Sequence, residues 1–387
     1  MSIQEAPKNF SFGEEEEMLR DLARRFLDEN LPVQKLRELV ASDTEAAYER
    51  GERSPWDEGL WKQIVELGWT GLAVPESAGG LGTSLAGIAG VVEEVGGHAL
   101  PSPLIATLCA TYVLREAEAA DGFLSRIADG STASLAITDA RGGWEPARCD
   151  VRAQADGDAL LLNGTACFVQ DAFKADFFVV SARTDGELAL YVVEADAAGA
   201  TLAQDHIHDL TRDQGRLQLQ NVRVSADAIV SRDGEAVLQR AWPAMLVTVS
   251  ADLCGAAEWQ LQTTVQYAKD RTQFERPLGF FQAVKHPLVD AMVGIDRARS
   301  LLYHAACEID QKSEEALTAA RMAKSQASDA GAYVSDRSVQ LHGGIGFTWE
   351  CDVHLYFKRS LHNQALYGDA AYQRARIAES LIGPIGG

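Results

Sequence analysis

The sequence has few cysteines, and none of them is paired at metal-binding or redox spacing. Its six cysteines are scattered along 387 residues without a Cys-x-x-Cys pair. This excludes the common dithiol and zinc motifs and predicts reduced thiols in a reducing compartment. His206 and His208 flank one isoleucine. Because no third ligand lies nearby, the sequence favours a polar loop there over a metal site, and we expect no metal.

Long apolar runs and clusters of positive charge are missing as well. No window offers the ~18–20 uninterrupted apolar residues of a membrane span, and the amino terminus carries no basic and apolar signal segment. The formal net charge is −21, with 35 Lys and Arg against 56 Asp and Glu. This balance disfavours nucleic acid and anionic membrane surfaces as the main partner. We expect a soluble, cytoplasmic protein that binds neither.

Several nucleotide and hydrolase motifs are absent. The sequence contains no Walker sequence, no G-x-S-x-G and no H-E-x-x-H. Gly343, Gly344 and Gly346 follow a helical pattern and not a strand, which excludes a Rossmann fingerprint. The stretch "GGLGTS" at residues 79–84 predicts a loop that leads into the N-cap of a helix.

The spacing of apolar residues divides the chain into zones, as its length requires, since one core usually serves only ~250–300 residues. From Phe10 to about residue 115 the spacing is helical. Between residues 131 and 235 it changes to short β-branched and aromatic runs. The turn signals between these runs are Asp156-Gly157, Asn163-Gly164 and Asp185-Gly186. No helix-length segment separates the runs, so we expect an antiparallel β domain.

After Pro243 the helical spacing returns and continues to a break at "RTQFERPLG". A second long run begins at Phe281, and a third begins near Ser313. Three long antiparallel helices would form most of a four-helix bundle, with the fourth helix from residues 365 to 383. The predicted fold class is α+β, with a helical domain, a β domain and a helix-bundle domain at residues 1–125, 126–237 and 238–387.

Two stretches of the last zone carry residue types that suit a nucleotide. In "RTQFERPLGFFQ", Arg271 ends a helical run, and Gln273, Phe274 and Gln282 follow it. An arginine fork suits a pyrophosphate, and an aromatic ring with amides suits a planar base; the alternative is solvent exposure and core packing. In "VQLHGGIGFTWE", an apolar helical run stops at glycines, which suits close approach of the backbone to a ligand or another chain.

Three separated stretches carry a resemblance to a known family. They are "GWTGLAVPESAGGLG", "RTQFERPLGFFQAVKHPL" and "VQLHGGIGFTWECDVHLYFKR", in this order around a β zone. Together they resemble the acyl-CoA dehydrogenase family over nearly the whole chain. The resemblance implies a β-barrel-like middle domain, a C-terminal four-helix bundle and a tetramer built as a dimer of dimers. It also implies FAD as cofactor, an acyl-CoA substrate and electron-transfer flavoprotein as electron acceptor.

The resemblance assigns roles to the two nucleotide-like stretches. In the family, the residues matched by Arg271, Phe274 and Gln282 grip an FAD that the neighbouring subunit mainly holds, and the stretch matching Gln340 to Gly344 closes over it. Glycine there lets the backbone approach a diphosphate closely. The predicted cofactor-binding residues are Arg271, Gln273, Phe274, Gln282, Gln340, Leu341, Gly343 and Gly344.

The catalytic residue of the family is missing. The family removes a proton next to a thioester carbonyl while a hydride leaves the following carbon for the flavin, and a glutamate usually takes the proton. At the two family positions of this glutamate the chain has Tyr367 and Met245. A phenol of pKa near 10 is ionised to about one part in a thousand at neutral pH. Asp369 and Asp252 are substitute candidates, and both also suit a helix end or the surface.

The family's flavin-ring contacts are also eroded, because only "AITDARGG" and "FVQDA" stand where its motifs are expected. Some bacterial members that act on bulky CoA thioesters, including steroid side chains, form α2β2 assemblies in which one subunit brings the base. This chain resembles the sibling subunit. The alternatives are a non-catalytic scaffold and a different flavin reaction, such as elimination or desulfination. Which acyl group binds depends on the width of the acyl pocket. That width requires a spatial map of residues 85–105 and 240–255.

Overall fold

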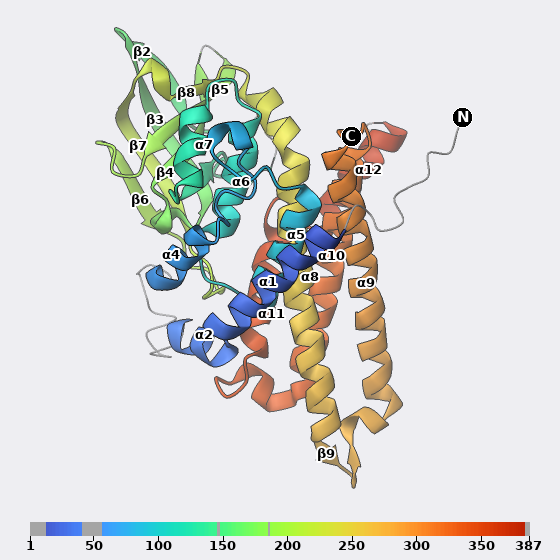
Figure 1. Ribbon diagram of the computed structural model, residues 1–387. Helices are drawn as coiled ribbons and strands as arrows, with labels where there is room; N and C mark the ends of the chain where they lie inside the picture. Colours follow the sequence, from blue (N-terminus) through green and yellow to red (C-terminus); the bar gives the residue numbers. More distant parts are fainter. Residues whose placement is uncertain (1–12, 41–55, 145–147, 185, 384–387) are drawn as a thin grey trace.

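The computed structural model describes residues 13–40, 56–144, 148–184 and 186–383. Helices at the amino-terminal end pack against both a β-sheet and a bundle of long helices (Figure 1). The bundle extends well beyond the rest of the molecule and ends at the β9 hairpin. No helix in the described part of the chain is long and apolar enough to cross a membrane.

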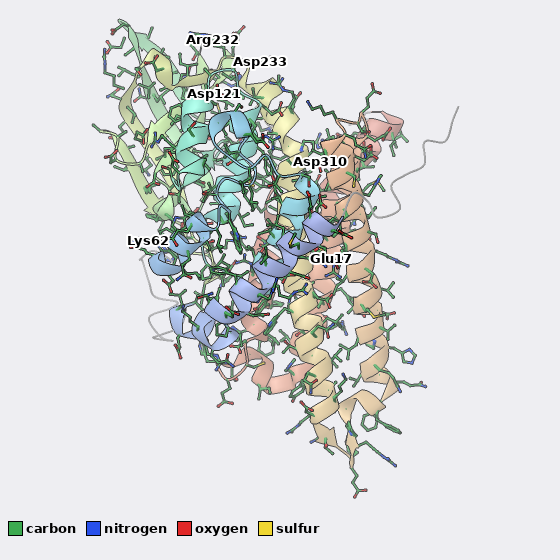
Figure 2. All side chains as sticks on the ribbon, viewed as in Figure 1. Glu17, Lys62, Asp121, Arg232, Asp233 and Asp310 are labelled. Carbon is green, nitrogen blue, oxygen red and sulfur yellow. The ribbon has the colours of Figure 1, made fainter. Side chains whose placement is uncertain are left out.

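The first region is helical, as predicted. Its helices are α1 (Glu14–Asn30), α2 (Val33–Val40), α4 (Glu58–Glu66), α5 (Leu85–Gly97), α6 (Leu104–Arg115) and α7 (Asp121–Ala128). The predicted N-cap after "GGLGTS" is confirmed, because Ser84 accepts a hydrogen bond from the backbone N–H of Gly87. Asp310, labelled in Figure 2, reaches the same helix start from the bundle and accepts from the backbone N–H groups of Leu85 and Ala86. The bundle therefore fixes the start of α5.

The middle region forms one eight-stranded sheet. Its strands are β1 (Ala133–Ala136), β2 (Arg152–Asp156), β3 (Ala159–Gln170), β4 (Phe177–Thr184), β5 (Glu187–Glu194), β6 (Ala200–Gln204), β7 (Gln214–Val224) and β8 (Ile229–Ser231). The hydrogen-bonded order is β6-β7-β3-β2-β4-β5-β8, with β1 beside β4. Over the described residues this path does not close, so the sheet is open where the resemblance implied a barrel-like domain.

Two details of the sheet correct the sequence prediction. Most strand pairs are antiparallel, but β1 and β2 both pair with β4 in parallel. Asn163 and Gly164 lie inside β3, where the pairing with β7 shifts register, and they form no turn. A Cβ at Gly164 would lie 2.4 Å from the carbonyl oxygen of Asp150, so the glycine serves a close strand approach. The predicted turn at Asp156-Gly157 does join β2 to β3, whereas Asp185 lies outside the described residues.

The last region is the helix bundle. It consists of α8 (Gly234–Asp270), α9 (Gln282–Asp310), α10 (Ala316–His342), α11 (Val353–Ala365) and α12 (Ala370–Ile382). Helix α8 starts before Pro243 and runs through it, because the residues on both sides of this proline are buried and packed. The predicted fourth helix over residues 365–383 corresponds to α12, which begins later, at Ala370. A turn around Tyr367 and Gly368, both at positive φ, separates α11 from α12.

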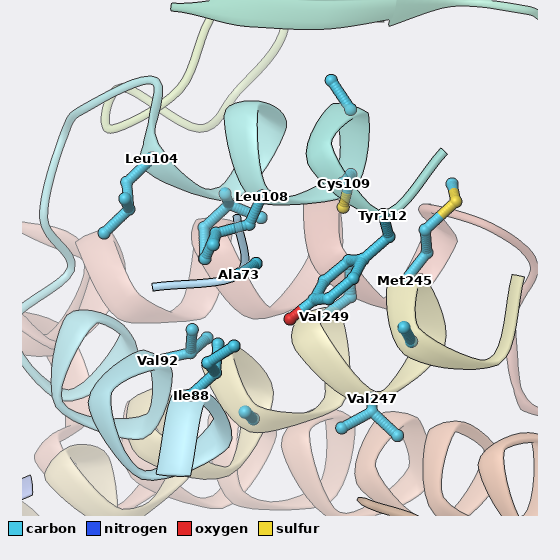
Figure 3. Close-up of a cluster of buried hydrophobic side chains, with 14 of the residues drawn as sticks. Ala73, Ile88, Val92, Leu104, Leu108, Cys109, Tyr112, Met245, Val247 and Val249 are labelled. Atoms are coloured by element: carbon cyan, nitrogen blue, oxygen red, sulfur yellow. The ribbon is translucent and has the colours of Figure 1, made fainter. Parts of the chain in front are cut away.

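Helices α5 and α8 cross at very short range, which joins the first region to the bundle. A Cβ at Gly255 would lie 1.8 Å from the carbonyl oxygen of Glu93, and a Cβ at Gly96 would lie 2.2 Å from that of Asp252. Only glycine fits at either position. One continuous hydrophobic core therefore extends from the amino-terminal helices into the bundle, and Figure 3 shows part of it.

A buried ionic network ties the bundle to the sheet region. The carboxylate of Asp252 on α8 accepts hydrogen bonds from Arg359 on α11 at 2.8 Å and from Arg212, which precedes β7, at 2.7 Å. Arg212 also lies 3.6 Å from Asp171, which follows β3. Burial alone would raise the pKa of Asp252, but the two arginines outweigh burial and hold this pKa below its ordinary value.

We predict that Asp252→Asn lowers the free energy of unfolding by about 3–5 kcal/mol at pH 7, because Arg359 loses its counter-charge and Arg212 is left with the more distant Asp171. Urea unfolding of the purified chain measures this change. The pKa of Asp252 is depressed in the folded chain. The stability that its carboxylate contributes is therefore fully present above pH 3.8, the ordinary pKa, and declines as the pH falls through the folded pKa. The difference between wild type and variant should therefore shrink in acid.

The matched control is Asp270→Asn, because Asp270 is exposed at the end of the same helix and accepts a hydrogen bond from Gln266, one turn earlier. We expect this variant to stay within about 0.5 kcal/mol of wild type. Equal losses in the two variants would contradict a specific role of the buried network.

Candidate functional site

One end of the bundle gathers the eight residues that the sequence predicts to bind a cofactor. Three of them lie on the connection from α8 to α9, Gln282 is the first residue of α9, and the other four lie where α10 ends. These segments touch, because Tyr267 stacks on His342 with ring centroids 4.3 Å apart, and Leu341 packs in the same cluster as Leu278 and Val284. Seven of the eight are exposed, and Leu341 is half-buried.

A strained hairpin presents an aromatic ring at this end. Strands β9 (Thr272–Gln273) and β10 (Arg276–Pro277) are joined by Phe274 and Glu275, whose φ angles are 52° and 61°. A residue with a side chain costs about 1–2 kcal/mol in this left-handed region. Phe274 is also 86% exposed, and its ring meets Phe281 only edge-on. Within the isolated chain, the contacts of this ring therefore offset little of the backbone strain.

The space beside this hairpin is open and suits an anion. A Cβ added at Gly343 or Gly344 would meet nothing within 4 Å in this chain. The first turn of α9 leaves backbone N–H groups without helical partners, and the positive end of the helix dipole lies there. Arg271 and Lys285 add exposed positive charge on either side of the turn, although the whole chain is strongly acidic. A phosphate group would be stabilised in this position.

A second region collects the positions at which the chain departs from the family pattern. Tyr367 is buried between Trp144 and Trp242, with ring centroids 5.3 Å and 5.4 Å away and both contacts edge-on. The cavity left beside Tyr367 measures about 10 Å³. Besides Tyr367 and Trp144, it is lined by Ala106, Ser134, Leu135, Ile137, Thr138, Phe168 and Gln170. Both eroded stretches, "AITDARGG" and "FVQDA", thus meet Tyr367 here.

Met245, at the other family position of the glutamate, belongs to the neighbouring core. Figure 3 shows it on α8 near Cys109 and Tyr112 of α6. All three side chains are buried. Helices α5 and α6 and the part of α8 around Met245 are almost entirely buried and share one core. The segments that would set the width of an acyl pocket thus pack extensively against one another.

None of the base candidates has the surroundings of a general base. Burial raises the pKa of Tyr367 well above its ordinary value, and Cys109 adds to this effect. Asp369 is exposed and caps α12 by accepting from the backbone N–H of Tyr372 at 2.8 Å. Asp252 is not at the surface but is held between two arginines. Neither carboxylate lines the space beside Tyr367.

The sequence analysis missed the two tryptophans around Tyr367. Trp242 precedes Met245 by three residues, so helical spacing could have placed it on the same face of α8. Trp144 lies in a loop after β1, and no local pattern indicates its contact with Tyr367. The described residues also contain no group of three or more His, Cys, Asp or Glu that could hold a metal.

Comparison with known proteins places the chain in a family. The model described as acyl-CoA dehydrogenase, N-terminal domain, matches residues 13–131, and that described as acyl-CoA dehydrogenase, C-terminal domain, matches residues 233–382. The chain is similar to acyl-CoA dehydrogenase IpdE2 of Mycobacterium tuberculosis, with 33% identity over 371 residues that cover 95% of this chain and 98% of the relative.

Two solved structures share the fold over almost their whole length. A variant of the Tcur3481-Tcur3483 steroid ACAD aligns with a TM-score of 0.83 and 30% identity, covering 95% of this chain and 98% of the other. The ChsE4-ChsE5 complex from Mycobacterium tuberculosis aligns with a TM-score of 0.86 and 27% identity, covering 97% and 100%. The chain therefore belongs to the acyl-CoA dehydrogenases, FAD-binding oxidoreductases that act on CH–CH groups.

Proposed function

We propose that this chain is the cofactor-completing subunit of a mixed α2β2 acyl-CoA dehydrogenase, in which a homologous subunit supplies the catalytic glutamate. One contrast carries this proposal. The end of the bundle that would reach a neighbour's FAD is exposed and open, whereas the region that would hold the chain's own flavin ring and thioester is filled by Tyr367.

The exposed end of the bundle fits part of an FAD held by a neighbour. Arg271 would pair with the diphosphate through its planar fork, and the ring of Phe274 would pack on the planar part of the cofactor. The open space at Gly343 and Gly344 would let their backbone approach the diphosphate. The side-chain amides of Gln273, Gln282 and Gln340 would offer hydrogen bonds to the cofactor. When bound, FAD supplies the acceptor for the substrate hydride.

The region around Tyr367 does not fit a flavin ring. A cavity of about 10 Å³ holds roughly one water molecule, so neither a three-ring flavin nor a thioester fits in the space between Tyr367 and Trp144. The raised pKa of Tyr367 also excludes its phenolate as a base at neutral pH. Proton removal, which a positioned base accelerates by roughly 10²–10⁴, must then come from another subunit.

The relatives support a mixed assembly and a bulky substrate. Two of the similar structures carry names that join two components, and one of these is named a steroid enzyme. We therefore propose a steroid-like acyl-CoA thioester as the substrate of the assembly. Electron-transfer flavoprotein as the acceptor and a cytoplasmic location remain predictions from the sequence.

The two alternatives make different demands on the structure. A scaffold without a cofactor role also fits the filled region at Tyr367, but it gives no reason for a strained and exposed Phe274. An elimination or desulfination without α-proton removal needs no base, yet it still needs room for a flavin in this chain. The strained hairpin therefore favours the cofactor-completing subunit.

The first prediction concerns the visible spectrum. We expect the chain purified alone to lack the flavin absorbance at ~450 nm, and a co-expressed homologue that carries the glutamate to restore it, together with dye-linked dehydrogenation. Stable flavin and turnover in the chain alone would refute the proposal. A complex that assembles without flavin would favour the scaffold.

The second prediction uses the two left-handed residues of the hairpin as a matched pair. Phe274→Gly and Glu275→Gly should each raise the free energy of unfolding by up to about 1 kcal/mol, because glycine removes the left-handed strain. Only Phe274→Gly should lower the flavin content of the mixed complex, since only it loses the ring. Urea unfolding and the absorbance at ~450 nm measure the two effects. Equal flavin loss in both variants would argue against a contact by Phe274.

A further inference from the structure

Lys324 on α10 has a buried amino group whose hydrogen-bond partners within the described residues are all uncharged. Its side chain is 0% exposed. Its Nζ donates to the carbonyl oxygens of Gln364 and Gly368, each at 3.0 Å, and to the hydroxyl of Ser328 at 3.1 Å. These three acceptors use all the N–H donors of an ammonium group. Burial lowers the pKa of Lys324 to about 7, and the exposed Asp369 offsets this only partly.

The two carbonyls that Lys324 binds flank Tyr367. This turn connects α11 to α12, and its backbone is strained at Tyr367, which has φ 58°, whereas glycine at position 368 adopts φ 93° without strain. A Cβ at Gly368 would lie 2.2 Å from the ring of Tyr372, so the turn has little freedom to relax. Gln373 adds a second clamp, because its Nε2 donates to the carbonyl oxygen of Tyr367 at 2.7 Å.

The same turn determines where the Tyr367 side chain lies. With the backbone held in this left-handed conformation, the ring inserts between Trp144 and Trp242, and its hydroxyl group reaches the thiol of Cys109. Cys109 is 1% exposed. Without Lys324, the carbonyl of Gln364 would lose this donor and that of Gly368 would be left with the 3.4 Å bond from Gln373, so the turn could leave its strained conformation.

We propose that Lys324 is a positioning residue that latches the turn at residues 364–368 and so keeps Tyr367 inserted between Trp144 and Trp242. The latch keeps the space beside Tyr367 closed. The identification of this space as a former flavin and acyl site rests on the proposed function. The space is then closed by the held turn as well as by the tyrosine that stands in place of the family's glutamate.

The thiol of Cys109 gives a direct test, since it is buried and interacts with the Tyr367 side chain. Native chain is treated with N-ethylmaleimide, and the alkylated cysteines are identified by peptide mass spectrometry over time. Lys324→Met keeps a similar side-chain length without N–H donors. We expect it to accelerate alkylation of Cys109 at least about tenfold by local opening, with no change at Cys254. Cys254 is buried on α8 and serves as the internal control for global unfolding.

Two further variants make the outcome decisive. Tyr367→Ala removes the inserted ring itself and should expose Cys109 at least as strongly as Lys324→Met. Gln373→Met removes the second clamp and should produce a smaller acceleration. Parallel acceleration at Cys109 and Cys254 in Lys324→Met would mean general destabilisation and would overturn the latch. Protection of Cys109 in either Lys324→Met or Tyr367→Ala would overturn it as well. The assay needs neither flavin nor a partner, so its failure is distinct from failure of the proposed function.

Discussion

The buried contact of Asp252 with Arg359 and Arg212 fixes how the three regions of this protein meet. Asp252 sits on α8 close to the glycine crossing with α5, Arg359 comes from α11, and Arg212 comes from the sheet region. A charged group without water requires its counter-charge in place, so this network permits little rearrangement between the regions. The position of α8 and α11 in turn sets the surroundings of Trp242 and Tyr367.

From that arrangement the two ends of α8 acquire opposite properties. Near its start, Trp242 and Met245 join a closed aromatic and apolar core around Tyr367. At its far end, Arg271 and the strained hairpin at Phe274 face outward into open space. A protein with an open, exposed bundle end and a filled pocket is suited to the proposed role of completing a cofactor site in another subunit. The proposed division of labour rests on packing at one end of α8 and exposure at the other.

Much of this organisation could be predicted from the sequence, because periodicity reports local structure. The order of helical, β and helical zones, the N-cap at Ser84 and the break after α8 are local features that the sequence states directly. The continuation of α8 through Pro243 and the register shift at Gly164 were missed, since both depend on tertiary packing that overrides local signals. A proline or an Asn-Gly pair predicts an end or a turn only when no such packing opposes it.

The site was predictable in part for the same reason. The predicted cofactor-binding residues lie on two short continuous stretches, so a motif could indicate them, although the joint position of these stretches needed the folded bundle. The insertion of Tyr367 between Trp144 and Trp242, with Lys324 beneath the turn, joins residues far apart in sequence. Neither the loop position of Trp144 nor the helical position of Lys324 carries a local sign of these contacts.

The most direct test of the central claim is to count flavins in the assembled complex by native mass spectrometry, after co-expression with a homologue that carries the glutamate. The account predicts a mixed tetramer in which each pair of unlike chains holds one FAD, with none bound when this chain is present alone. A homotetramer of this chain with one FAD for every subunit would contradict it.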